Sequence, residues 1–308
     1  MPTRRVDPCQ PDREDPTSPG LDGKPNLIVI GAHRAGTTAV YRFCQEHPQV
    51  YMSPIKETNF LAFDPDNPAH LRDHEQYPVR TLEEYRDQFR GVSAEPVVGE
   101  ASPNYLYSQL AVERIAKHLP EAGLLLMLRN PIDRLRSMYL AQVRDGRTRR
   151  SWQQAISSVP WLKRHAYCDN VARYVHAFGR QRLIVMFYED LEADANAFCS
   201  DLFGRLRVDP TFVPNLQIRH NKGGVPRSKL LHRLTTNKRV NTIAGSLVPH
   251  SWINAAKSVR NKNLDRPPPL EATEVTALRK VFRPDAERLE LLLDMELVDR
   301  WQLGRPET

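Results

Sequence analysis

An apolar run that leads through a glycine-bounded loop into a helix constrains the fold more than any other feature of this sequence. Residues 27–30 (LIVI) are rich in β-branched side chains and suit a parallel strand that is buried on both faces. After Gly36 the apolar residues take helical spacing, from Thr37 to about Glu46. A strand that passes through a short loop into a helix is the repeating unit of an α/β domain.

Further strand and helix units follow along the chain. Residues 124–128 (LLLML) precede Asn130–Pro131, a helix-capping residue followed by one that suits the first helical position. A third unit pairs a helix over 170–178 with a strand over 183–187, and Val97–Val98 favours a further short strand. This alternation predicts a P-loop-like, doubly wound, mainly parallel sheet flanked by helices, with a largely helical C-terminal part.

The composition sets the domain organisation. Of 308 residues, 40% are apolar, which is enough for one sizeable core. Residues 1–24 contain five prolines among charged and small residues, so this segment cannot bury enough apolar surface to offset its ordering entropy. We therefore expect a disordered N-terminal tail over 1–24 and a single domain over 25–308.

The four cysteines are widely scattered and show no CxxC spacing, which indicates neither a zinc site nor a disulfide framework. The most apolar stretch, 124–128, is far too short to cross a bilayer, and no signal-like apolar segment begins the chain. We therefore expect a protein of the cytoplasm, with no transmembrane segment and no metal.

The loop over 31–38 (GAHRAGTT) has the chemistry of a phosphate site, because backbone N–H groups at a helix N-terminus attract anions. Its two glycines have the spacing of the nucleotide-triphosphate loop GxxxxGK[ST], but Thr37 stands where that loop has its lysine. The basic side chain comes earlier, as Arg34. A structural turn with a chance arginine would have the same sequence.

A second motif, RNPIDRLRSMY over 129–139, follows the strand at 124–128. Arg129 leaves the carboxyl end of that strand, where open α/β sheets bind ligands, and its guanidinium suits a phosphate dianion. Ser137 lies two helical turns further and offers a neutral hydroxyl donor. For Arg134 we favour a structural role, on an exposed helix face and paired with a surface acid.

Together these motifs resemble the PAPS-dependent sulfotransferase family, where PAPS is 3′-phosphoadenosine 5′-phosphosulfate. The first loop resembles the family's 5′-phosphosulfate loop, and the second, about 95 residues later, resembles its 3′-phosphate motif RxPxxRxxSxY. Further similar segments are HP with KETNF over 47–60, GEASPNY over 99–105, FYEDL over 187–191 and, as a late nucleotide loop, HNKGG over 220–224.

The resemblance implies transfer of a sulfonate from PAPS to a hydroxyl group of a small-molecule, glycan or lipid acceptor. It is closest to bacterial and carbohydrate-type members, in which a Glu at the position of Glu57 is the usual catalytic base. Glu100 and His33 are the alternative bases in this chain. Some carbohydrate enzymes place a catalytic lysine where this chain has Ala101, and this departure leaves the acceptor class open.

The resemblance also implies a set of site residues. Arg34 would neutralise charge on the bridging oxygen and act with Glu57 in catalysis. Thr37 and Thr38 also suit a simple helix cap, and Lys222 with Gly223 also suits an ordinary turn. The implied nucleotide-binding residues are His33, Arg34, Ala35, Gly36, Thr37, Thr38, Arg129, Ser137, Lys222 and Gly223.

Two other functions fit parts of the sequence. A small-molecule P-loop kinase would use the GxxxxG spacing, although the missing lysine counts against it. A non-catalytic anion-binding protein would use residues 210–264, which hold ten Lys and Arg and no Asp or Glu. That segment equally suits a solvated basic face. We expect a hydroxyl-bearing acceptor as the partner and no nucleic acid.

Overall fold

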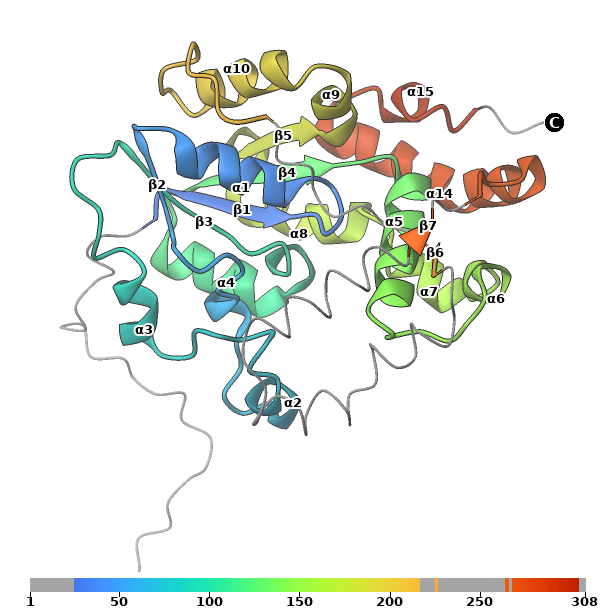
Figure 1. Ribbon diagram of the computed structural model, residues 1–308, viewed down its shortest axis with the longest axis horizontal. Helices are drawn as coiled ribbons and strands as arrows, with labels where there is room; N and C mark the ends of the chain where they lie inside the picture. The colour runs from blue at the N-terminus through green and yellow to red at the C-terminus, as the bar shows by residue number, and fades with distance from the viewer. Residues whose placement is uncertain (1–24, 217–224, 227–263, 266–267, 305–308) are drawn as a thin grey trace, which may run out of the picture.

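The computed structural model describes residues 25–216, 225–226, 264–265 and 268–304 (Figure 1). The tail predicted over 1–24 lies outside these residues. The strands are β1 (Leu27–Gly31), β2 (Val50–Met52), β3 (Val97–Ala101), β4 (Gly123–Leu128), β5 (Leu183–Phe187), β6 (Val225–Pro226) and β7 (Leu264–Asp265). The helices are α1 (Thr37–Glu46), α2 (Pro68–Arg72), α3 (Leu82–Asp87), α4 (Gln109–His118), α5 (Pro131–Arg144), α6 (Trp152–Ile156), α7 (Val159–Lys163), α8 (Cys168–Phe178), α9 (Tyr188–Ala193), α10 (Ala195–Arg205), α14 (Ala272–Leu293) and α15 (Leu297–Arg300), with short 3-10 helices η1 (Phe60–Ala62), η2 (Tyr105–Tyr107) and η3 (Arg180–Arg182).

Five strands form one parallel sheet in the order β2-β3-β1-β4-β5. The connection from β1 through α1 leads to β2, at one edge of the sheet. The connection from β4 leads to β5, at the opposite edge. Figure 1 accordingly shows α1 and α10 on one face of the sheet and α4 and α8 on the opposite face. The predicted fold class is confirmed. The reversal of strand order at β1 creates the position at which doubly wound sheets bind ligands, beyond the carboxyl ends of the strands.

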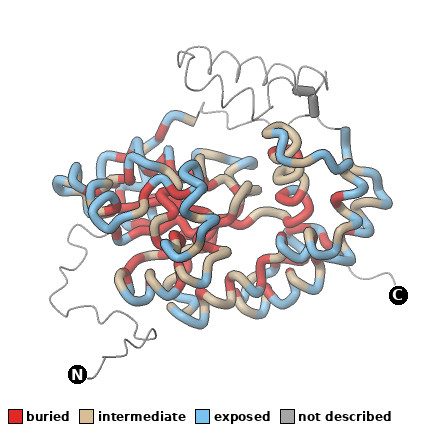
Figure 2. Tube along the Cα trace, turned by 90° about the horizontal axis from the view of Figure 1, so that it is seen from below, coloured by how far each residue is buried: buried red, intermediate tan, exposed pale blue. Residues whose placement is uncertain are grey.

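The two central strands form the middle of the core. Every residue of β1 is buried, as are the last five residues of β4. Figure 2 shows that buried residues gather at the centre of the molecule. Helices cover both faces of the sheet, so a central strand has no solvent-facing side. This explains the continuous apolar runs LIVI and LLLML, which lack the alternation of a half-exposed strand.

The C-terminal helix α14 is anchored to the middle of the chain. The Asp285 carboxylate accepts hydrogen bonds from the backbone N–H groups of Tyr167, at 2.6 Å, and Cys168, at 3.1 Å. These groups begin α8, where the first N–H groups have no partner within the helix. Burial raises the pKa of the Asp285 carboxyl group. A helical C-terminal part, as predicted, therefore packs on the sheet through α8.

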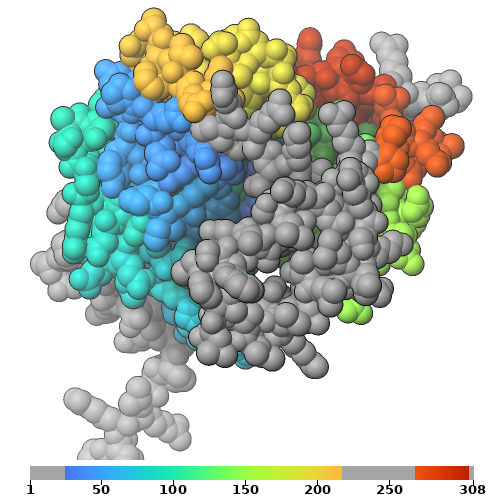
Figure 3. Space-filling view, viewed as in Figure 1, coloured from blue at the N-terminus to red at the C-terminus, as the bar shows by residue number. Residues whose placement is uncertain are grey.

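The segment after β5 returns to the N-terminal part of the chain. On the face shown in Figure 3, α9 and α10 (yellow to orange) lie against the blue N-terminal segment. His47 Nε2 lies 3.0 Å from the backbone oxygen of Asp209, and the backbone N–H of Asn215 donates to Glu46 at 2.6 Å. Among the described residues, no helix is long and apolar enough to span a membrane.

Candidate active site

The loop between β1 and α1 lies beyond the carboxyl end of the central strand. It turns sharply, because Arg34 has φ 66° and Gly36 has φ 92°. A Cβ atom at Gly36 would lie 2.9 Å from Cδ2 of Tyr188, so both the backbone conformation and the lack of space require glycine there. The loop is consequently held between α1 and the end of β5.

The N-terminus of α1 offers backbone donors. Gly36 is the N-cap residue, and no side chain caps this helix end. The N–H groups of Gly36, Thr37 and Thr38 have no hydrogen-bond partner among the described residues. Unsatisfied N–H groups at a helix N-terminus form a ready site for an anion. The side chains of Thr37 and Thr38 therefore do not cap α1, which was the alternative role for these two residues.

The two sequence motifs meet at this loop. Arg34 Nε donates to Ser137 Oγ at 3.1 Å, across 103 residues of sequence, and Arg129 Nη1 donates to the backbone oxygen of Arg34 at 3.3 Å. Burial lowers the pKa of the Arg34 guanidinium, and the nearby charges of Arg144 and Arg129 lower it further. A cluster of cations that disfavour one another's charge would be stabilised by a bound anion.

Arg129 is held in place by groups that the sequence motifs did not identify. Its guanidinium lies over the ring of Tyr188, 4.1 Å from the centroid. The Tyr167 hydroxyl accepts from the backbone N–H of Arg129, at 3.2 Å, and donates to its backbone oxygen, at 3.0 Å. The Glu189 carboxylate accepts from the next N–H, that of Asn130, at 2.6 Å. Tyr188 and Glu189 belong to the FYEDL segment. Its resemblance to the family was the one sequence feature that could have indicated these supporting residues.

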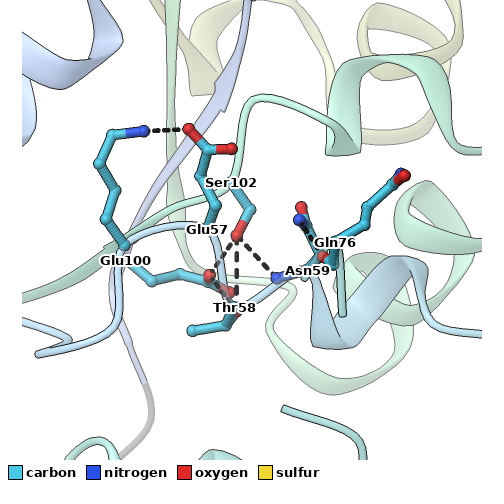
Figure 4. A network of polar contacts seen from close by, with 7 residues as sticks. Glu57, Thr58, Asn59, Gln76, Glu100 and Ser102 are labelled. Atoms are coloured by element: carbon cyan, nitrogen blue, oxygen red, sulfur yellow. Dashed lines mark hydrogen bonds and ion pairs between the residues drawn. The ribbon is translucent and has the colours of Figure 1, made fainter. Parts of the chain in front are cut away.

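Glu57 lies on the loop between β2 and η1, in the left-handed backbone region with φ 65°. Its N–H donates to the backbone oxygen of Ala101 at 2.9 Å, which ties the loop to the end of β3. The Glu57 carboxylate forms a salt bridge with Lys56 and is 41% exposed, so one end of it remains accessible (Figure 4). A carboxylate so placed can accept a proton from a ligand.

Glu100, one of the alternative bases, is enclosed. Its Oε2 accepts from Thr58 Oγ1 at 2.7 Å and from Ser102 Oγ at 2.9 Å (Figure 4). Its Oε1 accepts from Tyr85 at 2.8 Å and from Tyr105 at 2.9 Å. The residue is fully buried, and burial raises the pKa of its carboxyl group. Four hydroxyl donors leave this carboxylate no accessible lone pair for a substrate proton.

The network around Glu100 determines where Glu57 lies. Thr58 follows Glu57 directly and donates to Glu100, and the N–H of Asn59 donates to Ser102 Oγ at 3.1 Å. Asn59 also has a left-handed backbone, with φ 51°. Such conformations are costly for residues other than glycine, so the buried hydrogen bonds must hold them. Glu100 thus supports the loop that presents Glu57.

His33, the other alternative base, stacks on Tyr107 with ring centroids 5.6 Å apart. Burial lowers the pKa of His33 to about 4, and the charge of Glu57 opposes this shift while that of Lys56 adds to it. The imidazole is therefore neutral near pH 7. The charges of Glu57 and Lys56 thus lie close enough to His33 to affect the pKa of its imidazole.

Arg134 departs from the expectation of an exposed position. It is fully buried, and its guanidinium donates to the Tyr107 hydroxyl at 2.8 Å and to the backbone oxygen of His165. It also lies over the Tyr167 ring, 4.2 Å from the centroid. No surface acid pairs with it among the described residues. Arg134 instead supports the rings of Tyr107 and Tyr167, which contact His33 and Arg129, because it lies on the buried face of α5.

Some predicted residues cannot be placed. Lys222 and Gly223 lie outside the described residues, as does most of the basic segment 210–264. Ala35 is buried inside the first loop. Among the residues that the structure describes, no group of three or more His, Cys, Asp or Glu side chains is placed to hold a metal ion.

Comparisons with known proteins bear on the family and the fold of this chain. The sequence profile of the sulfotransferase family matches residues 25–211. A crystal structure of a sulfotransferase from Alicyclobacillus acidocaldarius superposes with a TM-score of 0.66 at 26% identity, covering 91% of this chain and 99% of that one.

Curated relatives match over parts of their length. The membrane-associated sulfotransferase kil1 of Dictyostelium discoideum is 26% identical over 80% of this chain and 43% of its own. Carbohydrate sulfotransferase 15 of Rattus norvegicus is 31% identical over 38% of this chain and 27% of its own. The chain thus spans less than half the length of these curated relatives.

Proposed function

This chain belongs to the sulfotransferase family, and from that premise we propose that it transfers a sulfonate group from PAPS to a hydroxyl group of an acceptor. The donor supplies an activated sulfonate on a phosphosulfate anhydride and leaves as 3′,5′-ADP. The observation that carries the proposal is the meeting of Arg34, Arg129 and Ser137 at the N-terminus of α1. Two motifs distant in sequence thereby contribute to one nucleotide site, with a place for each phosphate of the donor.

The residues present fit the two ends of this donor. The N–H groups of Gly36, Thr37 and Thr38 suit the 5′-phosphate, because they lie at a helix N-terminus without partners among the described residues. Arg129 and Ser137 suit the 3′-phosphate. The geometry of Arg129 supports this assignment. Its guanidinium is positioned by the Tyr188 ring, and its backbone N–H and backbone oxygen both bond to the Tyr167 hydroxyl.

Arg34 and Glu57 carry the proposed chemistry. Sulfonate transfer resembles phosphoryl transfer in its loose, in-line transition state, so positioning and charge stabilisation dominate. The new bond joins the acceptor oxygen to sulfur, the bond between sulfur and the bridging oxygen breaks, and that oxygen keeps the electron pair. Arg34 stabilises the charge that develops on the oxygen, and a Glu57 carboxylate oxygen takes the hydroxyl proton.

The printed names of two relatives support a carbohydrate acceptor. Carbohydrate sulfotransferase 15 and a heparan sulfate N-deacetylase/N-sulfotransferase of Mus musculus both match this chain. The second name denotes transfer to nitrogen, so it supports the carbohydrate class and not the hydroxyl group. We propose a carbohydrate hydroxyl as the first acceptor to examine, ahead of lipid and other small-molecule hydroxyls. The cytoplasmic location stays a prediction.

The test is a transfer assay with PAPS and a panel of glycans, in EDTA, with release of 3′,5′-ADP as the readout. We expect sulfated product and equal rates with and without EDTA. Transfer of phosphate from ATP that depends on magnesium, with no product from PAPS, would establish a kinase instead.

A further inference from the structure

A cavity of about 430 Å³ lies beside the C-terminal half of α5. The loop over 145–150, α6 and α7 bound its other sides, and Figure 1 shows these two helices next to α5. Its volume is within the range of small-molecule sites, roughly 300–1,000 Å³. The described side chains that give it its character are Tyr139, Gln142, Arg147, Thr148, Arg150 and Trp161.

The cavity begins one helical turn from Ser137, at the edge of the proposed nucleotide site. Ser137, which contacts Arg34, and Ala141, which lines the cavity, are four residues apart and so share a face of α5. Arg134 donates to Tyr107, the ring on which His33 stacks. It is also four residues from Met138, which lines the cavity. One turn of helix advances about 5.4 Å. A ligand in the cavity therefore lies about one helical turn from the contact between Ser137 and Arg34, the residue proposed to act on the bridging oxygen.

The cavity has an excess of positive charge. Arg147 and Arg150 line it and are exposed to solvent. Asp145 is the one acidic residue among the described lining residues, and it pairs with Arg144 at 2.9 Å. No salt bridge joins Arg147 or Arg150 to an acid among the described residues. An anionic group on a ligand would therefore meet two arginines whose charge no acid among the described residues offsets.

The loop that carries these arginines is fixed at several points. The Tyr139 hydroxyl donates to the backbone oxygen of Arg150 at 3.0 Å. The N–H of Arg147 donates to the backbone oxygen of Gln142 at 2.8 Å, and the N–H of Arg150 donates to Thr148 Oγ1 at 3.2 Å. The backbones of both arginines are thus positioned before a ligand binds, which reduces the entropy lost on binding.

Two aromatic rings give the cavity an apolar wall. Tyr139 packs edge-on against Trp152, with centroids 5.2 Å apart, and Trp161 packs edge-on against His165, with centroids 4.9 Å apart. Tyr139 and Trp161 are each only partly buried. Rigid rings of this kind combine apolar area with polar edges, which suits a ring that carries hydroxyl groups, such as a sugar.

We propose that this cavity binds the acceptor and selects a saccharide that carries a carboxylate or a sulfate ester, with the anion on Arg147 and Arg150 and the sugar ring against Trp161. Guanidinium groups suit both anions, because their planar donors match two oxygen atoms at once. The inference rests on the proposed function in one respect only, that the ligand is called an acceptor.

The test uses three p-nitrophenyl β-D-glucopyranosides that differ only at carbon 6: the neutral glucoside, the glucuronide and the 6-O-sulfate. Binding to the full chain is measured by calorimetry, with and without 3′,5′-ADP. At low salt we expect at least one anionic probe to bind about tenfold more tightly than the glucoside. Which anion binds more tightly identifies the acceptor's charged group. The preference should decrease as salt is added, because the arginines are exposed.

The variants are Arg147→Ala with Arg150→Ala, and a matched control, Arg149→Ala, which removes an exposed arginine of the same loop that does not line the cavity. The double variant should lose most of the preference for the anionic probe over the neutral glucoside. The control should keep this preference, apart from the small decrease that follows from removing one positive charge. Both should bind 3′,5′-ADP as tightly as the unaltered protein.

Three outcomes would overturn the inference: neither anionic probe binds, the neutral probe binds equally well, or Arg149→Ala has the same effect as the double variant. A failure to bind 3′,5′-ADP would count against the proposed function alone, because the preference among the three probes is also measured without nucleotide.

Discussion

Glu57 adopts a backbone conformation that residues with a side chain seldom adopt. Its φ of 65° and the φ of 51° at Asn59 each cost on the order of 1 kcal/mol. Backbone strain of this kind persists only where neighbouring contacts fix it, and here the Ala101 carbonyl and the Ser102 hydroxyl do so. The chain thus holds one partly exposed carboxylate in a defined place beside the phosphate loop.

If Glu57 is the base, Glu57→Gln should reduce turnover by about a hundredfold or more, because the amide keeps the shape but cannot accept the proton. The affinity for 3′,5′-ADP should stay nearly unchanged. Steady-state kinetics with the acceptor found in the panel, alongside nucleotide calorimetry, measures both. Glu113→Gln, an exposed carboxylate on α4, is the control. Near-normal turnover in Glu57→Gln, with loss in His33→Ala, would assign the base to His33.

At the residue scale the sequence predicted which motif residues meet better than it predicted the residues that support them. Arg34, Arg129 and Ser137 were found from their motifs, and the structure brings them together. Arg134 was expected at the surface but is buried. The expectation was wrong because a charged residue on a helix is usually exposed unless it has buried partners, and these partners were not known. Those partners, Tyr107 and the His165 carbonyl, lie far away in sequence.

The segment between β2 and η1 depends on the buried carboxylate at the end of β3. Glu100→Gln places an amide, with its two donors, among four hydroxyl groups that now donate to Glu100. We expect the free energy of unfolding to fall by about 1–3 kcal/mol. The loop that carries Glu57 should also move, so turnover should fall at least tenfold.

The control for this prediction is the binding of 3′,5′-ADP, which should change little, because no contact of Glu100 reaches Arg129 or Ser137 among the described residues. Urea unfolding and kinetics on the same preparation separate the two effects. A variant that loses stability but keeps full turnover would show that Glu100 serves the fold alone.

At the element scale the long apolar runs were decisive. The strands predicted over 27–30, 124–128 and 183–187 are observed as Leu27–Gly31, Gly123–Leu128 and Leu183–Phe187. The helix predicted over 37–46 is observed as Thr37–Glu46. The three-residue strand β2 was not predicted, because so short a segment has no periodicity to detect. The strand order was also beyond prediction, since it depends on which faces the crossover helices cover.

At the scale of the whole molecule, buried His165 and partly buried His33 make the folded state sensitive to acid. Burial lowers the pKa of His165 to about 3 and that of His33 to about 4, both below the unfolded value of 6.5. Between pH 6.5 and about 4 the unfolded chain therefore binds protons that the folded chain does not, so folding stability from these groups falls as the pH falls. The buried carboxyl groups, with raised pKa values, act in the opposite direction.

A comparison with His165→Asn isolates one of these contributions, because the carboxyl groups are common to both proteins. The unaltered protein should lose about 2 kcal/mol more stability than the variant between pH 7 and pH 5. Urea unfolding at the two pH values measures the difference. A gap between the two proteins that does not change with pH would show that His165 titrates normally in the fold.

The measurement that tests the central claim most directly is the affinity of the chain for 3′,5′-ADP compared with 5′-AMP, because the two nucleotides differ only in the 3′-phosphate. We predict at least tenfold tighter binding of 3′,5′-ADP, equivalent to about 1.4 kcal/mol. Arg129→Ala should remove most of this preference, and Arg205→Ala, an exposed arginine on α10, should keep it. Equal affinity for the two nucleotides, or an unchanged preference in Arg129→Ala, would contradict the proposed site.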